Sequence, residues 1–285
     1  MLALSGVFKF SAKNITHFLA ALFLDKNQKK SYTNYTKRGT PPQKEETLMP
    51  ISKTDFVRGL QCEKMLWLDA HAPELKIIPP EIQEKLDAGN AFGDVAMGIF
   101  GDYTETTTFR DDGRLNYAAM ITKTQELLAA FTPVICEGSF TWYGNFCAAD
   151  ILRKTGNGYT MYEVKNTFYA REAFLTDLGF QAFILQKCGV SLKGVHLVLR
   201  GDEPPQDAVK DDFEHTATYM ESNGFRYRII DVTNAIKPYQ KMASERIFEL
   251  GKIKKKDAIM PNVSVGAHCE APYRCWYFEH CHKNH

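Results

Sequence analysis

The sequence of 285 residues lacks an excess of either charge, since 35 Lys and Arg residues stand against 34 Asp and Glu residues and leave a net charge of +1. No overall basic field therefore indicates a nucleic-acid partner, although a local groove would be enough to bind one. No apolar run is long enough to cross a bilayer, and no convincing secretory signal is present. We expect a cytoplasmic protein with no membrane partner.

Cysteine is sparse too, and its spacing lacks the paired C-x2-C knuckles of zinc ribbons. The odd count of seven and the expected reducing compartment favour free or metal-bound thiols over disulfides. Cys269, Cys275 and Cys281 follow one another at six-residue steps near the C-terminus. Together with the distant Cys62 they supply four thiolates, the number that a [4Fe–4S] cluster needs.

Such a cluster would be a structural clasp, because it would tie the first helix of the domain to its last segment and close a very long loop. Two alternatives stay open. The four cysteines could be unligated, or they could bind zinc with help from a nearby histidine (His268, His280 or His282). The remaining cysteines (Cys136, Cys147 and Cys188) are expected to be buried, inert thiols.

Residues 1–48 differ in composition from the rest of the chain. A stretch rich in Lys, Thr and Gln, with Pro41-Pro42, is typical of disorder. We expect a disordered extension, or a start site wrongly assigned upstream of Met49. Residues 49–285 form the predicted domain, since a chain with 44% apolar residues can bury one full core.

Residues 134–165 are the stretch around which the domain is organised. Aromatic and β-branched runs, separated by Gly and Asn, predict strands over 134–142, 146–152 and 159–165. Helical patterns are predicted before them (52–68, from about 81, and 116–131) and after them (171–187 and 235–250). The run 195–199 is apolar almost throughout, as in a buried parallel strand. The element order α-β-β-β-α-β predicts an α/β fold with a central mixed sheet flanked by helices.

Three charged residues fall within this central stretch. Glu163 and Lys165 are two residues apart, so their side chains leave the same face of their strand. A turn at Gly156-Asn157 pairs Asp150 with Glu163, whereas a turn at Asn157-Gly158 pairs Asp150 with Lys165. Either register keeps all three side chains on one face of the sheet.

Two carboxylates and a lysine on one face suit a hard divalent cation, Mg²⁺ or Mn²⁺, which binds one or two carboxylates and keeps several waters. Such an ion lowers the pKa of a bound water and offsets charge that develops on a phosphodiester. Lys165 would orient or deprotonate that water. The alternative interpretation is a surface hairpin whose three charged residues are solvated or weakly paired.

The order Asp150, then Glu163-Val164-Lys165 on the next strand, resembles the PD-(D/E)XK nuclease superfamily, which has a restriction-endonuclease-like core. The resemblance implies that Asp150 and Glu163 bind the metal, that Val164 lends it a backbone carbonyl, and that Lys165 is the catalytic lysine. The chain is most similar to the RecB-like members, over roughly residues 51–281.

Gln181 occupies the glutamine position of the Q-x-x-x-Y motif of that group, which implies that it positions water or substrate. Two positions depart from the pattern: Leu185 stands where the tyrosine belongs, and Asn90 stands where a metal-binding histidine is usual. Glu137 on the first strand could replace the missing ligand. The departures keep open a non-catalytic nucleic-acid-binding module of the same fold.

The arrangement of one upstream cysteine and three C-terminal ones resembles the iron–sulfur clasp of the CRISPR-adaptation and AddB-type members of this family. An uncharacterised RecB-like group with a C-x5-C-x5-C end fits better. This resemblance implies a [4Fe–4S] cluster held by Cys62, Cys269, Cys275 and Cys281.

Phosphate contacts are predicted for one dense basic run and for two residues of the first helix. These residues are Lys252, Lys254, Lys255, Lys256, Arg58 and Lys64. We therefore predict a metal-dependent deoxyribonuclease that acts on single strands or duplex ends of DNA and carries an iron–sulfur cluster. The alternatives are an inactive binding module of the same fold and a zinc-stabilised interaction protein.

Overall fold

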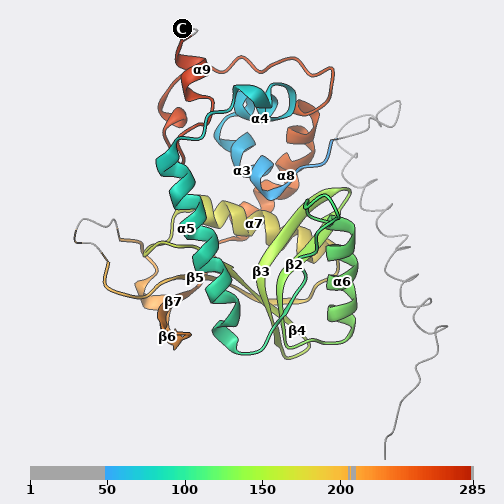
Figure 1. Ribbon diagram of the computed structural model, residues 1–285, viewed down its shortest axis with the longest axis vertical. Helices are drawn as coiled ribbons and strands as arrows, with labels where there is room; N and C mark the ends of the chain where they lie inside the picture. The colour runs from blue at the N-terminus through green and yellow to red at the C-terminus, as the bar shows by residue number, and fades with distance from the viewer. Residues whose placement is uncertain (1–48, 205, 207–209, 284–285) are drawn as a thin grey trace, which may run out of the picture. The chain divides into compact units, whose positions relative to one another are not determined.

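The computed structural model describes residues 49–204, 206 and 210–283. They build a seven-stranded mixed β-sheet flanked by helices, so the α/β prediction is confirmed at this level (Figure 1). The described residues belong to one compact unit. The predicted extension over residues 1–48 lies outside the described residues.

The strands follow the spatial order β1-β2-β3-β4-β5-β7-β6. β2, β3 and β4 form an antiparallel meander, and β4 then pairs in parallel with β5, as the sequence pattern predicted. The short β1, parallel to β2, and the β6–β7 hairpin, antiparallel to β5, extend this core at its two sides. The bounds are β1 Thr104–Glu105, β2 Val134–Trp142, β3 Asn145–Thr155, β4 Gly158–Val164, β5 Leu192–Arg200, β6 Ala217–Ser222 and β7 Phe225–Asp231.

The register of the β3–β4 hairpin settles which turn the chain uses. Thr155 pairs with Gly158, so Gly156-Asn157 is the turn, and Gly156 has φ 57, a value that glycine adopts easily. The ladder continues to the pair of Ile151 and Tyr162. One step further along the same register places Asp150 opposite Glu163.

Helices cover both faces of the sheet (Figure 1). They are α3 Lys53–Gln61, α4 Glu63–His71, α5 Pro80–Ala96, α6 Tyr117–Ala129, α7 Glu172–Lys187, α8 Lys237–Ile253 and α9 Phe278–Lys283, with 3-10 turns η2 Pro73–Leu75, η3 Met97–Phe100, η4 Glu214–Thr216 and η5 Ala267–Cys269. α7 packs on one face beneath α3, α4 and α8, while α5 and η3 cover the other face. Gly179 allows the close crossing of α7 and α8, since a Cβ there would lie 2.4 Å from the Cβ of Tyr239.

The first predicted helix is in fact two. Ser52 and Asp55 form a capping box, and α3 starts there. Cys62 then takes an extended conformation (φ −159, ψ 112) and serves as both the C-cap of α3 and the N-cap of α4. The expectation of one helix through residue 68 is therefore wrong, because the chain turns at Cys62 to bring α4 against α8.

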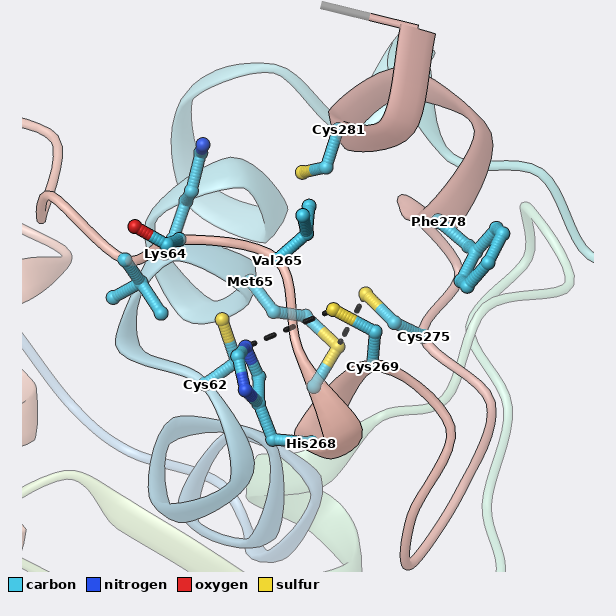
Figure 2. Close-up of a pocket in the computed structure, with 11 residues that line it drawn as sticks. Cys62, Lys64, Met65, Val265, His268, Cys269, Cys275, Phe278 and Cys281 are labelled. Carbon is cyan, nitrogen blue, oxygen red and sulfur yellow. Dashed lines mark hydrogen bonds between the residues drawn. The ribbon is translucent and has the colours of Figure 1, made fainter. Parts of the chain in front are cut away.

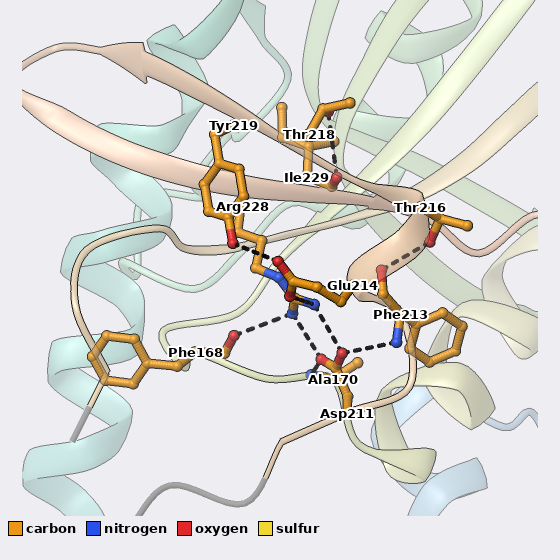
Figure 3. A network of polar contacts seen from close by, with 10 residues as sticks. All are labelled: Phe168, Ala170, Asp211, Phe213, Glu214, Thr216, Thr218, Tyr219, Arg228 and Ile229. Carbon is orange, nitrogen blue, oxygen red and sulfur yellow. Dashed lines mark hydrogen bonds and ion pairs between the residues drawn. The ribbon is translucent and has the colours of Figure 1, made fainter. Parts of the chain in front are cut away.

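A buried ion pair fixes the chain that joins β4 to α7 (Figure 3). Arg228 on β7 is 3% exposed, and both of its terminal nitrogens donate to Asp211 at 2.8 Å. The Asp211 carboxylate also accepts from the Ala170 backbone at 2.6 Å, and Arg228 donates to the Phe168 carbonyl at 3.4 Å. These contacts anchor residues 168–170 to the sheet and thereby set where α7 begins.

In the described part of the chain, no helix is long and apolar enough to cross a membrane. All seven cysteines are free thiols rather than disulfides. Cys136 and Cys147 are buried as predicted, whereas Cys188 is half-buried at the end of α7.

Candidate functional site

Glu163 lies at the centre of the sheet. β4 is the fourth of seven strands and all its residues are buried, and Glu163 itself is 0% exposed. A buried carboxylate is tolerated only when it is paired and hydrogen-bonded. Here Glu163 Oε1 accepts from Lys53 Nζ at 3.0 Å and from Lys165 Nζ at 2.7 Å, and Oε2 accepts from Gln181 Nε2 at 2.8 Å. Burial opposes ionisation, but Lys165 and Lys53 outweigh it and lower the pKa of Glu163.

Asp150 joins this group from β3. Its Oδ2 accepts a hydrogen bond of 2.7 Å from the Val164 backbone N–H, which holds the carboxylate beside the end of β4. Burial and the charge of Glu163 raise the pKa of Asp150 to about 7, although Lys53 and Lys165 oppose the rise. The contact that the structure shows for Val164 is thus through its N–H.

Lys165, the first residue after β4, bridges two carboxylates. Its Nζ lies 2.7 Å from Glu163 Oε1 and 2.9 Å from Asp177 Oδ2. Burial favours the neutral amine, but the charges of Asp177 and Glu163 prevail and raise the pKa of Lys165. Lys165 in this arrangement is a protonated donor, which favours the predicted orienting role over the predicted role as a base.

α7 supplies the amide and a third carboxylate. Gln181 and Asp177 lie four residues apart and so project from one face of the helix toward the sheet. Gln181 Oε1 and Asp177 Oδ1 are buried, and neither atom has a hydrogen-bond partner in the described residues. Leu185, one turn further, is fully buried in the main core. Asn90 lies exposed on α5.

Two members of the group, Lys53 and Asp177, were not predicted. Lys53 in the first turn of α3 is 110 residues upstream of Glu163, and nothing in the sequence links the two. Asp177 did leave a signal, since it stands one turn before Gln181 in a helix that is otherwise apolar on that face. Lys53 also lies 3.8 Å from Asp177 Oδ2.

Glu137 stands at an irregularity in β2. It has φ 55, a left-handed value that strains a residue other than glycine. The β2–β3 ladder pairs residues 136 with 151 and 138 with 149, but skips the pair of Glu137 and Asp150. Hydroxyls of Thr106 and Ser139 donate to the Glu137 carbonyl instead. Such breaks in a strand are common next to active sites.

The irregularity brings a further carboxyl group to the site. Burial and the charge of Asp150 raise the pKa of Glu137 to about 8. The site thus holds four carboxyl groups against two ammonium groups, so acidic groups outnumber the cations that balance them. A bound cation would relieve this imbalance. Among the described residues, however, no three His, Cys, Asp or Glu side chains are arranged to hold a metal by themselves.

The four predicted cysteines line one small pocket, which we call the cysteine pocket (Figure 2). Cys62 comes from the junction of α3 and α4, Cys269 from η5, Cys275 from the following loop, and Cys281 from α9. His268 also lines it, and its Nε2 lies 3.7 Å from Cys269 Sγ. Residues more than 200 apart in the sequence therefore meet here, as the clasp prediction requires.

The surroundings of the cysteine pocket disfavour deprotonated cysteines that have no metal bound to them. Burial, together with the neighbouring thiols of Cys62, Cys281 and Cys269, raises the pKa of Cys275 to about 11. Burial also raises the pKa of Cys62 and of Cys281. Four thiolates would need a positively charged group between them. As with the carboxylates, the thiols of the described chain are not arranged as a metal coordination sphere.

Several of the residues predicted to contact nucleic acid make contacts within the domain instead. Arg58 pairs with Asp69 at 2.7 Å and stacks on the Trp276 ring at 3.6 Å, so it holds the C-terminal segment against α3. Lys64 lines the cysteine pocket. Lys254 donates to Asp55 at 2.7 Å and to the Pro50 carbonyl at 3.0 Å.

The rest of the basic run lies at the end of α8. Lys252 pairs with Glu249 at 3.0 Å, both exposed. The Lys255 carbonyl contacts His71, while Lys256 is exposed. Lys252 and Lys254 therefore pair with carboxylates of the domain itself, while the exposed Lys256 can face a partner.

Tyr273 belongs to the loop between Cys269 and Cys275, and Gln61 at the end of α3 donates to its carbonyl at 2.6 Å. Burial raises the pKa of its phenol.

Comparison with known proteins yields no relative: no protein-family model matches the chain, and no curated protein matches it.

Proposed function

We propose that this protein is a metal-dependent nuclease that hydrolyses phosphodiester bonds of DNA, on single strands or duplex ends. The observation that carries the proposal is the meeting of Asp150, Glu163, Lys165 and Gln181 on one side of the central strand. Their strand and helix positions are those expected for a restriction-endonuclease-like, RecB-type core. The surplus of acidic groups supports a cation among them.

Mg²⁺ or Mn²⁺ fits this donor set. Asp150, Glu163 and the Val164 carbonyl would hold it, with Glu137 as a further carboxylate, and water would complete its shell. When bound, the ion makes a water more acidic and offsets charge on the phosphate. Because Glu163 already accepts from Lys53 and Lys165, the ion would share or displace one of these ammonium groups.

The chain's own residues divide the remaining work. Lys165, kept protonated by Asp177 and Glu163, donates hydrogen bonds to the attacking water or to a phosphate oxygen. The Nε2 of Gln181 fixes Glu163, while its unpartnered Oε1 accepts a hydrogen from water or substrate. Lys53 balances the charge of Glu163 when the Gln181 amide and the Lys165 ammonium group contact the substrate.

Cys62, Cys269, Cys275 and Cys281 would hold a [4Fe–4S] cluster as a structural clasp. The donor set fits, since four thiols face one pocket and the raised pKa values of Cys62, Cys275 and Cys281 disfavour free thiolates. Zinc, with His268 as a possible ligand, fits the same pocket less well because four thiols are already present. A brown preparation that absorbs near about 400 nm would favour iron over zinc.

Cleavage of end-labelled single-stranded DNA with Mn²⁺ tests the proposal. We expect Asp150→Ala and Lys165→Ala to lower the cleavage rate by about 100-fold or more, because each removes charge stabilisation of the transition state. Lys193→Ala, at an exposed lysine of β5, is the matched control and should cleave like the parent. Equal cleavage by parent and both site variants would place the activity elsewhere.

A second candidate is a nucleic-acid-binding module of the same fold that does not cleave. The observation that favours it is the ammonium group of Lys53, which already supplies a positive charge to Glu163. On this view the two lysines replace the divalent ion. It predicts DNA binding without cleavage by the parent, and no cleavage in any divalent salt.

A further inference from the structure

A second pocket lies where the chain runs from β4 to α7, and we call it the aromatic pocket because three of its lining residues are aromatic. It has a volume of about 250 Å³ and is lined by this connection, by the end of β5 and by the β6–β7 hairpin. A cavity of about 150 Å³ is enough for a benzene ring, so the aromatic pocket has room for a planar ring of nucleobase size. Its lining includes Phe168, Tyr169, Arg200, Asp202, Tyr219 and Arg228.

The strand register places the aromatic pocket on the same face of the sheet as the acidic site. Glu163 on β4 pairs with Leu197 on β5, and Leu199, two residues further on, pairs with Arg228 on β7. Arg228 pairs in turn with Tyr219 on β6. Paired residues and residues two apart project from one face of a sheet. Two strand spacings of about 4.8 Å and a step of about 7 Å along the strand separate the Cα atoms of Glu163 and Arg228 by about 12 Å.

The backbone leads directly from the acidic site into the aromatic pocket. Phe168 and Tyr169 follow Lys165 by three and four residues. The Thr167 N–H donates to the Lys165 carbonyl at 2.8 Å, and the Arg200 N–H donates to the Thr167 carbonyl at 2.9 Å. The connection is thereby held against the end of β5, so the two sites keep a fixed separation.

Flat groups form much of the lining. The guanidinium carbon of Arg200 lies 4.6 Å from the centre of the Phe168 ring, and that of Arg228 lies 5.5 Å from the centre of the Tyr169 ring. Both rings belong to half-buried residues. Aromatic rings and guanidinium planes are the surfaces on which unpaired bases stack in nucleic-acid-binding proteins.

The charges of the aromatic pocket suit a neutral ring better than a phosphate group. Arg228 is 3% exposed and is paired with Asp211 at 2.8 Å (Figure 3). Arg200 Nε donates to Asp202 at 3.0 Å. A phosphate would compete with these carboxylates for the two guanidinium groups, whereas a base edge uses donors and acceptors side by side. Lys210, the third cationic lining residue, is exposed and can face the phosphate attached to such a base.

We propose that the aromatic pocket binds one unpaired base of the DNA strand whose phosphate lies at the acidic site. This inference rests on the proposed function, since it takes the ligand to be a nucleic-acid strand. The separation of about 12 Å corresponds to about three nucleotides at the duplex spacing of about 3.4 Å. A base that is paired within a duplex cannot enter the pocket, so the pocket selects single strands or frayed ends.

The test scans a short single-stranded DNA with one abasic site at each position in turn. The Kd is measured with Ca²⁺ in place of Mn²⁺, for the parent, Tyr169→Ala, Tyr169→Phe and Tyr103→Ala. Tyr103 is a matched control, because it is an exposed tyrosine that precedes β1. We expect an abasic site at one position to weaken binding by the parent about tenfold, as loss of one stacked base does.

Tyr169→Ala should bind the intact strand about tenfold more weakly and no longer respond to the abasic site at that position. Tyr169→Phe keeps the ring and should retain the response of the parent, as should Tyr103→Ala. A parent that responds equally at every position overturns the inference, and so does a Tyr169→Ala protein that keeps the response.

Cleavage by the parent with Mn²⁺ is scored separately. If the parent cleaves and shows no sensitive position, the inference fails and the proposed function stands. If the parent binds DNA without cleaving it, the proposed function fails while the abasic scan still decides the role of the aromatic pocket. A parent that neither binds nor cleaves DNA overturns both.

Discussion

The acidic site and the cysteine pocket are held in place by different forces. Asp150 and Glu163 are placed by the backbone ladder of the central sheet, which exists whether or not a ligand is bound. The cysteines come from a helix junction, a loop and two short helices, with few backbone hydrogen bonds between them. The acidic site is thus preorganised at the expense of stability, whereas the proposed cluster or zinc ion would add to the stability of the cysteine segment.

The largest effect should come from removing one cysteine. Cys62→Ser is expected to abolish stoichiometric iron or zinc and to lower the free energy of unfolding by several kcal/mol, because a structural metal is part of the folding energy. Metal analysis and thermal unfolding measure both. Cys188→Ser, at a half-buried cysteine outside the pocket, should leave the metal content unchanged. A Cys62→Ser protein with the parent's metal content and Tm would show that the cysteine pocket is not stabilised by a metal bound to Cys62.

Asp150→Asn should have the opposite profile. We expect the cleavage rate to fall about 100-fold or more while Tm stays level or rises, since the amide keeps an acceptor for the Val164 N–H and removes a half-buried charge beside Glu163. Single-turnover cleavage and thermal unfolding report the two quantities. A clear fall in Tm would show that the carboxylate stabilises the fold.

The pH dependence of stability sharpens the same point. The pKa values of Asp150, about 7, and Glu137, about 8, lie above those of the unfolded chain, so the folded state binds more protons between about pH 4 and 8. Without divalent cations, the urea midpoint should therefore fall as pH rises through this range. Mg²⁺ should oppose the fall, and more strongly at pH 8 than at pH 6, because it binds the ionised carboxylates. A midpoint that rises between pH 5 and 8 without divalent cations would contradict the assignment.

The smallest expected effect concerns the strained strand residue. Glu137→Gly should raise the free energy of unfolding by about 1 kcal/mol, since glycine accepts φ 55 and the half-buried carboxyl is removed. Phe131→Gly, at an exposed residue with φ 54, reports the relief of strain without a buried charge. Equal gains at both positions would show that burial of the Glu137 carboxyl costs nothing. Cleavage by Glu137→Gly tests in addition whether this carboxyl serves the metal.

Local patterns were enough to predict much of this fold. Alternating runs with Gly-Asn turns defined the meander, period-3.6 runs defined α6, α7 and α8, and two-residue spacing placed Glu163 and Lys165 on one face. The sequence also predicted that Cys62 lies with the three C-terminal cysteines, because a [4Fe–4S] cluster takes four thiolates, and the four line one pocket. These features depend on neighbours in the chain or on ligand number, both of which the residues themselves determine.

Tertiary structure alone decided the rest. The turn at Gly156-Asn157 selected one of two registers that the sequence left open. Lys53 reached Glu163 because α3 packs on α7, over a separation of 110 residues for which no sequence periodicity exists. The pKa values of Asp150 and Glu137 likewise depend on burial and on nearby charges. Contacts between distant segments have no local signature, because they are set by how whole elements pack.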